Sequence, residues 1–230
     1  MPVKKGRAEQ LNGIKRKKPF REVTRLDRQL LLYEIFYYCE EVSFEEITNR
    51  IPMDKRMIQR DIADLTDAGL LSVRYSRKIQ AYIDDWKAEK TEEKQQKKVM
   101  TQRRKEHLER LYRVAVLMFE LMHDEVDEGE KFDRSRYKSC KDYYFEYFPE
   151  ATLSRMYRDF AQLNRIGYGI EYIPEMDFYV MWEDEGLRES FGIVKKDGKL
   201  YFETNESKEW ERLSSTWEEL VYFEEEERDW

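Results

Sequence analysis

The sequence predicts a mainly α-helical fold with small β-hairpins (α+β), in which three helices and a hairpin occur twice. Apolar residues recur at helical spacing before each of two runs of strand-forming residues, and a twelve-residue segment of the first half recurs in the second. We therefore expect five regions: a basic flexible arm (1–22), a first domain (23–84), a charged helical linker (85–105), a second domain (106–184), and an acidic C-terminal hairpin and helix (185–230).

The helices expected in the first domain have recognisable ends. A first amphipathic helix spans about 24–39, and Ser43 with Glu46 forms a capping box for a short helix at 44–50. Asp54 is suited to cap a third helix, because its carboxylate can accept the free N–H groups of the first turn. Gly69 suits the left-handed position that ends such a helix.

The third helix separates apolar from polar side chains. Ile58, Ile62 and Leu65 recur at i, i+4 and i+7, so one stripe faces a core. The opposite side carries Lys55, Arg56, Gln59 and Arg60. These side-chain types contact phosphates and the edges of guanine and adenine in the major groove, although a solvated helix face can carry them too.

A basic hairpin is expected to follow. Strand-forming runs at 70–75 and 79–83 flank Ser76-Arg77-Lys78. Three helices followed by a basic hairpin is the order of a winged helix-turn-helix DNA-binding domain. We expect three residues to read bases and four to hold phosphates: Arg56, Gln59 and Arg60 for the bases, and Lys55, Arg74, Arg77 and Lys78 for the phosphates.

Three short motifs carry a family resemblance: Arg56, the step Gln59-Arg60-Asp61-Ile62, and the closing Ala68-Gly69-Leu70. With them, residues 24–83 resemble the N-terminal domain of DeoR-type bacterial transcriptional regulators. The resemblance implies operator binding and transcriptional control by a bacterial protein, usually as an oligomer. The two cysteines, too few for a disulfide framework, predict a cytoplasmic protein, which would be associated with the nucleoid when bound. The signatures of the ligand-sensing domains that follow in such regulators are not found after residue 84.

Charge is distributed unevenly. Residues 1–113 carry 27 basic and 19 acidic side chains, a net +8, whereas residues 114–230 carry 15 and 30, a net −15. This asymmetry is typical of a DNA-binding end joined to a regulatory or assembly end. In the arm, Lys15, Arg16, Lys17 and Lys18 either contact the phosphate backbone or minor groove, or form a solvated tail.

The second domain is expected to be a degenerate copy of the first. At an offset of 98, residues 156–167 match 58–69 at five of twelve positions. The contact positions differ, since Lys55 becomes Leu153, Gln59 becomes Tyr157 and Arg74 becomes Tyr172. Arg155 and Arg158 remain as contacts that the second copy could make. We expect this copy to pair with protein, and the alternative uses a second basic patch of Arg134, Arg136, Lys138 and Lys141.

Two further helices are expected outside these domains. Residues 86–105 are mostly Lys, Glu, Gln and Arg without Gly or Pro, which indicates an extended helix that spaces the two copies or joins a partner chain. Near the C-terminus, Asp197-Gly198 signals a hairpin. It precedes an amphipathic helix whose apolar stripe either packs on the second domain or forms a dimer interface: Trp210, Leu213, Trp217 and Leu220.

Catalytic, metal and cofactor sites have little support. His107 and His123 are the two histidines, and neither lies at metal-ligand spacing from a cysteine. No apolar run approaches the ~20 residues of a membrane helix. The sequence therefore predicts a double-stranded DNA-binding regulator, a homodimer without enzymatic activity or cofactor. Its acidic half is expected to supply self-association or contact with a protein partner. The alternatives are a plasmid or phage replication initiator with tandem winged helices, and a protein-interaction adaptor.

Overall fold

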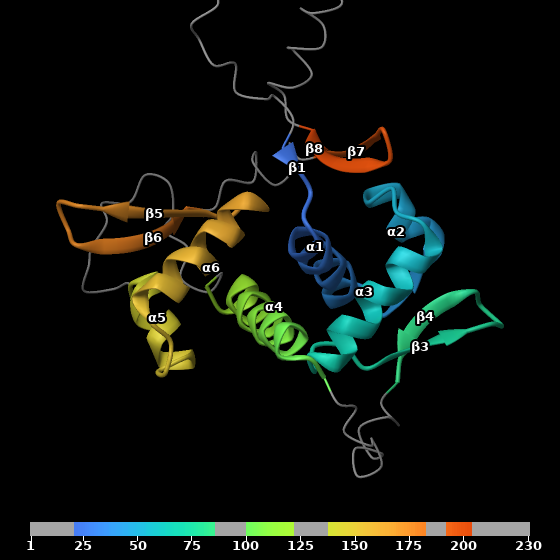
Figure 1. Cartoon of the computed structure of the whole chain (residues 1–230), viewed down its shortest axis with the longest axis horizontal. Helices are drawn as coiled ribbons and strands as arrows, with labels where there is room; N and C mark the ends of the chain where they lie inside the picture. Colours follow the sequence, from blue (N-terminus) through green and yellow to red (C-terminus); the bar gives the residue numbers. More distant parts are fainter. Residues whose placement is uncertain (1–20, 86–99, 122–137, 183–191, 204–230) are drawn as a thin grey trace, which may run out of the picture.

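The computed structural model describes residues 21–85, 100–121, 138–182 and 192–203, which combine six helices with small antiparallel sheets in an α+β arrangement (Figure 1). The helices are α1 Arg25–Tyr38, α2 Phe44–Arg50, α3 Lys55–Asp67, α4 Gln102–Glu120, α5 Cys140–Tyr147 and α6 Leu153–Arg165. The strands are β1 Arg21–Glu22, β2 Glu41–Ser43, β3 Val73–Ser76, β4 Ala81–Asp84, β5 Gly169–Ile173, β6 Phe178–Trp182, β7 Gly192–Lys196 and β8 Lys199–Glu203.

The two halves of the molecule repeat one order of elements (Figure 1). In the first half (21–85), α1, α2 and α3 precede the β3–β4 hairpin; in the second (100–182), α4, α5 and α6 precede the β5–β6 hairpin. The helices α3 and α6 each have 13 residues, and their bounds differ by 98, the offset of the sequence repeat. Gly69 and Gly167, after these helices, have φ of 77° and 103°, which residues with a Cβ rarely adopt.

The helix starts follow the predicted capping chemistry. Ser43 and Glu46 form the expected capping box of α2, and Asp54 accepts a hydrogen bond of 2.9 Å from the Met57 N–H at the start of α3. Ser139 is the N-cap of α5, which begins at Cys140. Of the alternative basic patch, Arg134 and Arg136 lie outside the described residues.

One short strand distinguishes the halves. In the first half, β2 pairs with β4 and places Ser43 opposite Ala81, which makes the order β2-β4-β3. In the second half, the hydroxyl of Ser139 accepts a 3.1 Å hydrogen bond from the Tyr179 N–H of β6. A side chain thus makes the contact there that a backbone strand makes in the first half, and within the described residues the β5–β6 sheet has two strands.

The halves share one core. α1 packs against α3 and α4, and α4 also packs against α6. Buried residues of both halves, such as Leu30, Leu65, Leu111 and Met156, belong to a single hydrophobic cluster. At one end of the α1–α4 contact, the rings of Tyr37 and Phe119 stack with centroids 3.6 Å apart. The halves therefore pack directly on each other.

The predicted linker helix needs correction at its end. Thr101 is the N-cap of α4 and Met100 is not helical, so no continuous helix crosses residues 100–101 into the second half. α4 begins there because the Thr101 side chain accepts a hydrogen bond from the Arg104 N–H. The rest of the charged segment, 86–99, lies outside the described residues.

The predicted C-terminal hairpin is present, but it is not a separate element. β7 and β8 pair across a turn in which Asp197 and Gly198 have positive φ. β8 also pairs with β1, so the sheet order is β1-β8-β7. Arg21 and Glu22, predicted as the end of the arm, are a strand because the exposed edge of β8 offers them backbone partners.

Two predicted groups lie outside the described residues. They are the arm residues Lys15, Arg16, Lys17 and Lys18, and the helix with Trp210, Leu213, Trp217 and Leu220. In the parts that are described, no helix combines the length and apolar character needed to span a bilayer.

Candidate nucleic-acid interface

The outer side of α3 presents four polar residues, which we call the α3 face: Lys55, Arg56, Gln59 and Arg60. All four are exposed, whereas Ile58, Ile62 and Leu65 on the other side are buried. The predicted division of this helix into a core side and a polar side is therefore confirmed.

The residues of the α3 face differ in how they are held. The Lys55 ammonium lies 4.9 Å from the ring centroid of Phe44 and 6.0 Å from that of Tyr75, which ties the start of α3 to α2 and β3. The side chains of Arg56, Gln59 and Arg60 make no hydrogen bond or ion pair with another described residue. Their donors are therefore available to a ligand.

The β3–β4 hairpin adds a basic turn beside this helix. Arg77 and Lys78 are exposed in the turn at 77–80, and Gln80 closes it with φ of 57°. Arg74, on β3, is also exposed, and its Nε lies 3.8 Å from an oxygen of Asp85. At that distance the ion pair is weak, so Arg74 keeps donors for another anion.

Buried carboxylates fix α3 from behind. Asp61 accepts hydrogen bonds from Arg28 and Gln29 of α1, and Asp64 accepts one of 2.7 Å from Gln29. A buried carboxylate is tolerated only when it is paired and hydrogen-bonded. These pairs give the α3 face a rigid base, because α3 cannot rotate without breaking them.

Sequence reasoning used Asp61 as part of a motif and missed this role. The signal was available, since Asp61 follows exposed Arg60 directly and lies among buried residues of the helix. A carboxylate in that position requires a cation from a neighbouring element.

The second half has the same internal arrangement. Asp159, at the position of Asp61, accepts hydrogen bonds from Arg113 (2.7 Å) and Arg110 (3.3 Å) of α4 and from the hydroxyl of Tyr144 (2.9 Å). Burial, together with the nearby Asp159 charge, raises the pKa of Tyr144 to about 12, so this phenol stays a protonated donor. Both third helices are thus held by a buried aspartate.

The outer side of α6 is different in chemistry. The positions equivalent to the α3 face, which we call the α6 face, are Leu153, Ser154, Tyr157 and Arg158. Leu153 and Tyr157 are 47% and 50% exposed, and Tyr172 on β5 is 45% exposed. Tyr179 of β6 joins these rings, with centroids 4.9 Å from Tyr172 and 6.4 Å from Tyr157.

Few cations remain on this side of the second half. Arg155 and Arg158 are exposed, and the Arg158 Nε donates a 3.0 Å hydrogen bond to the Ser154 carbonyl of its own helix. Lys138 forms an ion pair with Glu146 and lies 4.7 Å from the Tyr143 ring centroid. The described part of the alternative basic patch is therefore already partly engaged.

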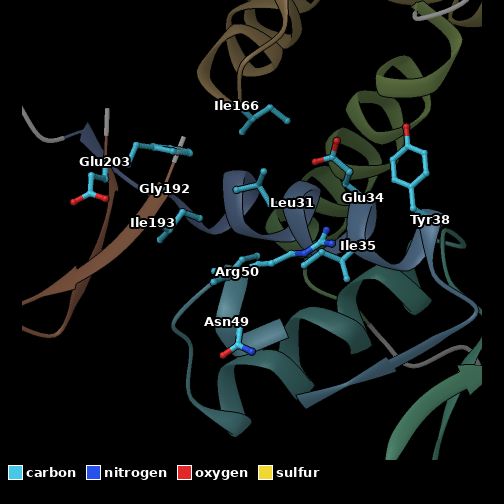
Figure 2. Close-up of a pocket in the computed structure, with 12 residues that line it drawn as sticks. Leu31, Glu34, Ile35, Tyr38, Asn49, Arg50, Ile166, Gly192, Ile193 and Glu203 are labelled. Carbon is cyan, nitrogen blue, oxygen red and sulfur yellow. The ribbon is translucent and has the colours of Figure 1, made fainter. Parts of the chain in front are cut away.

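A cavity of about 600 Å³ lies where both halves meet the terminal hairpin (Figure 2). Leu31 and Ile35 of α1, Ile166 after α6 and Ile193 of β7 give it apolar walls. The Arg50 side chain extends from α2 along α1, and α1 carries Glu34 and Tyr38. Of the described residues that line this cavity, Arg50 is a cation and Glu34 and Glu203 are carboxylates, so the charge of the lining favours no one class of ligand.

Comparison of the chain with protein-family models, curated proteins and solved structures found no significant match. The resemblance of residues 24–83 to DeoR-type regulators therefore stays a prediction. Within the described residues, no group of three or more His, Cys, Asp or Glu side chains is arranged to hold a metal ion.

Proposed function

We propose that this protein is a sequence-specific double-stranded DNA-binding transcriptional regulator built from two winged helix-turn-helix units. The observation that supports this best is the α3 face, where three adjacent long polar side chains are exposed and make no hydrogen bond or ion pair with another described residue. Exposed side chains of this kind on a helix are suited to base edges in the major groove.

The proposed roles follow from position. Arg56, Gln59 and Arg60 read base edges, Arg and Gln being the side chains that bond guanine and adenine in two places. Lys55, at the first turn of α3, contacts a phosphate. Arg74, Arg77 and Lys78 contact phosphates from the adjacent hairpin, which sets the orientation of α3 in the groove.

The second half has another role in this proposal. Leu153, Tyr157 and Tyr172 form an exposed aromatic and apolar surface at positions where the first half is basic or polar. Aromatic residues are enriched at protein interfaces. We assign this surface to self-association or to a protein partner. If both halves bound protein alone, the chain would be an adaptor.

Selection of duplexes from a randomised pool tests the proposal. The wild type should enrich a defined motif. The logarithm of its association constant should fall linearly with the logarithm of salt concentration, with a slope of about −0.9 per phosphate contact. Arg56→Ala/Arg60→Ala should lose the motif and retain only salt-dependent, sequence-independent binding. A wild type that enriches no motif and binds duplex no better than the double variant would contradict the proposal.

A further inference from the structure

A second cavity, of about 620 Å³, lies between the two halves. Its lining includes four arginines and a histidine: Arg25 from α1, and Arg103, Arg104, His107 and Arg110 from α4. Among the described residues that line it there is no carboxylate, and none belongs to the α3 face or to the turn at 77–80. It is therefore a site separate from the proposed DNA interface.

Ion pairs and hydrogen bonds fix three of these arginines but leave some of their N–H donors unbonded. Arg25 forms an ion pair with Asp64, and Arg104 donates through Nη2 to Asp64 (3.0 Å) and Asp67 (2.6 Å). Arg110 donates through Nε to Asp159 and through Nη2 to the Arg158 carbonyl. A guanidinium has five N–H donors, so each of these groups keeps donors for a bound anion.

Arg103 contributes an unmatched charge. It is exposed and makes no hydrogen bond or ion pair with another described residue. The three other arginines are balanced by Asp64, Asp67 and Asp159 outside the lining. As far as the described residues go, an anion in the cavity would therefore find one cation without a carboxylate partner, Arg103, and several oriented N–H groups.

His107 enters as a neutral group. Burial is the main cause that lowers its pKa below 6.5, and the positive charge of Arg25 lowers it further. The carboxylates Asp64 and Asp61 oppose this shift, and Arg110 adds to it. Its Nε2 lies 2.8 Å from the Gln29 side-chain oxygen, an acceptor, so Nε2 carries the proton.

The starts of α1 and α4 add to the positive field. Thr24 and Thr101, the N-caps of these helices of 14 and 19 residues, both line the cavity. Helix N-termini favour anions, because their backbone dipoles are aligned and their first N–H groups are not paired within the helix.

We propose that this cavity binds a small phosphorylated ligand through Arg25, Arg103, Arg104 and Arg110. Guanidinium groups bond phosphate oxygens in pairs, and the cavity volume lies in the range of about 300–1,000 Å³ that small-molecule sites occupy. Its position between the halves favours a free phosphate ester over the DNA backbone. Because Arg25 and Arg104 both bond Asp64 of α3, the ligand stabilises one arrangement of α3 relative to α4.

Calorimetric titration of the full chain tests this, with pyrophosphate and a nucleoside triphosphate as probes. The wild type should bind both, and Arg103→Glu should weaken binding about tenfold or more, because a repelling charge replaces a charge-assisted donor. Arg103 bonds no described residue, so thermal unfolding should be nearly unchanged. The matched control is Arg155→Glu, an equal charge change on α6, which should leave probe binding intact.

Two outcomes would overturn the inference: absence of binding of either probe to the folded wild type, and equal weakening by both glutamate variants. The source of the phosphate is tested separately. Arg56→Ala/Arg60→Ala should keep probe binding even if the DNA proposal fails. If duplex DNA displaces pyrophosphate and Arg103→Glu abolishes duplex binding as well, the cavity binds DNA phosphates, and the small-ligand inference is wrong.

Discussion

The third helices of the two halves share an interior and differ in their outer surfaces. α3 and α6 have the same length, and each is held to the first helix of its half by a buried aspartate, Asp61 or Asp159. Outside, Lys55 and Gln59 of α3 correspond to Leu153 and Tyr157 of α6. The repeated interior therefore specifies the fold, whereas the exposed positions determine what each half can bind.

The contacts between the halves are reciprocal with reversed charge. Asp27, the third residue of α1, accepts hydrogen bonds from Gln162 and Arg165 of α6. Arg104, the third residue of α4, donates to the equivalent positions of α3, Asp64 and Asp67. Two first halves placed in this geometry would oppose Asp27 to Asp64 and Asp67. The reversal therefore favours pairing of unlike halves.

The largest expected effect tests the shared interior. Asp61→Ala and Asp159→Ala should each lower the free energy of unfolding by about 3–5 kcal/mol, because each leaves a largely buried arginine, Arg28 or Arg113, without its carboxylate. Urea denaturation measures both. Asp67→Ala, at an exposed ion pair, is the control and should lose about 1 kcal/mol or less. If either substitution left the free energy of unfolding unchanged, the buried aspartate would not stabilise the third helix in the same way in both halves.

The contact of Asp27 with Arg165 predicts that the stability of the protein depends on pH. Burial raises the pKa of Asp27, but hydrogen bonds from Arg165 and Thr24 outweigh it, so the pKa lies below the ordinary 3.8. The stabilisation is therefore present above pH 3.8 and is lost as pH falls through the lower pKa of the folded state. Asp27→Asn should lose about 1–3 kcal/mol at pH 7. Its stability should then fall less than that of the wild type on acidification, and parallel curves would contradict this.

The β3–β4 hairpin should increase the affinity for DNA without contributing to the sequence preference. Arg77→Ala/Lys78→Ala should reduce the magnitude of the salt slope of DNA binding by about 1 per contact and leave the selected motif unchanged. Fluorescence anisotropy over a salt series measures this. Lys105→Ala/Lys195→Ala removes two exposed charges elsewhere and is the control. An altered motif would mean that the turn reads bases.

The smallest effect on stability is expected at the α6 face. Leu153→Ser should change the free energy of unfolding by about 0.5 kcal/mol or less, because the side chain is half exposed. Sedimentation should nevertheless show weaker self-association than for the wild type. If the assembly is unchanged by Leu153→Ser and by Tyr157→Ser, the α6 face is not the self-association surface.

Local chemistry made much of the fold predictable. Capping residues such as Ser43 and Asp54 mark helix starts, and the apolar stripe of Ile58, Ile62 and Leu65 identifies the buried side of α3. The exposed position of the four α3-face residues follows from the same periodicity.

Long-range contacts were not predictable in this way. β1 is two residues long and pairs with β8 about 180 residues later, so no local pattern announces it. The packing of α1 on α4 depends on contacts such as Tyr37 with Phe119, whose side chains carry no signal of their partner. The cavity between the two halves also depends on that packing, because only the contact of α1 with α4 brings Arg25 and Arg103 together from distant parts of the sequence.

We propose that the first half reads DNA and that the second half does not. The most direct measurement compares Arg56→Ala/Arg60→Ala with Arg155→Ala/Arg158→Ala on the selected duplex, because each pair removes two exposed arginines from the third helix of its half. The first pair should weaken binding about 30-fold or more, from two lost base contacts of about 1–3 kcal/mol each, and the second by less than about threefold. Equal losses, or a larger loss from the second pair, would contradict the account.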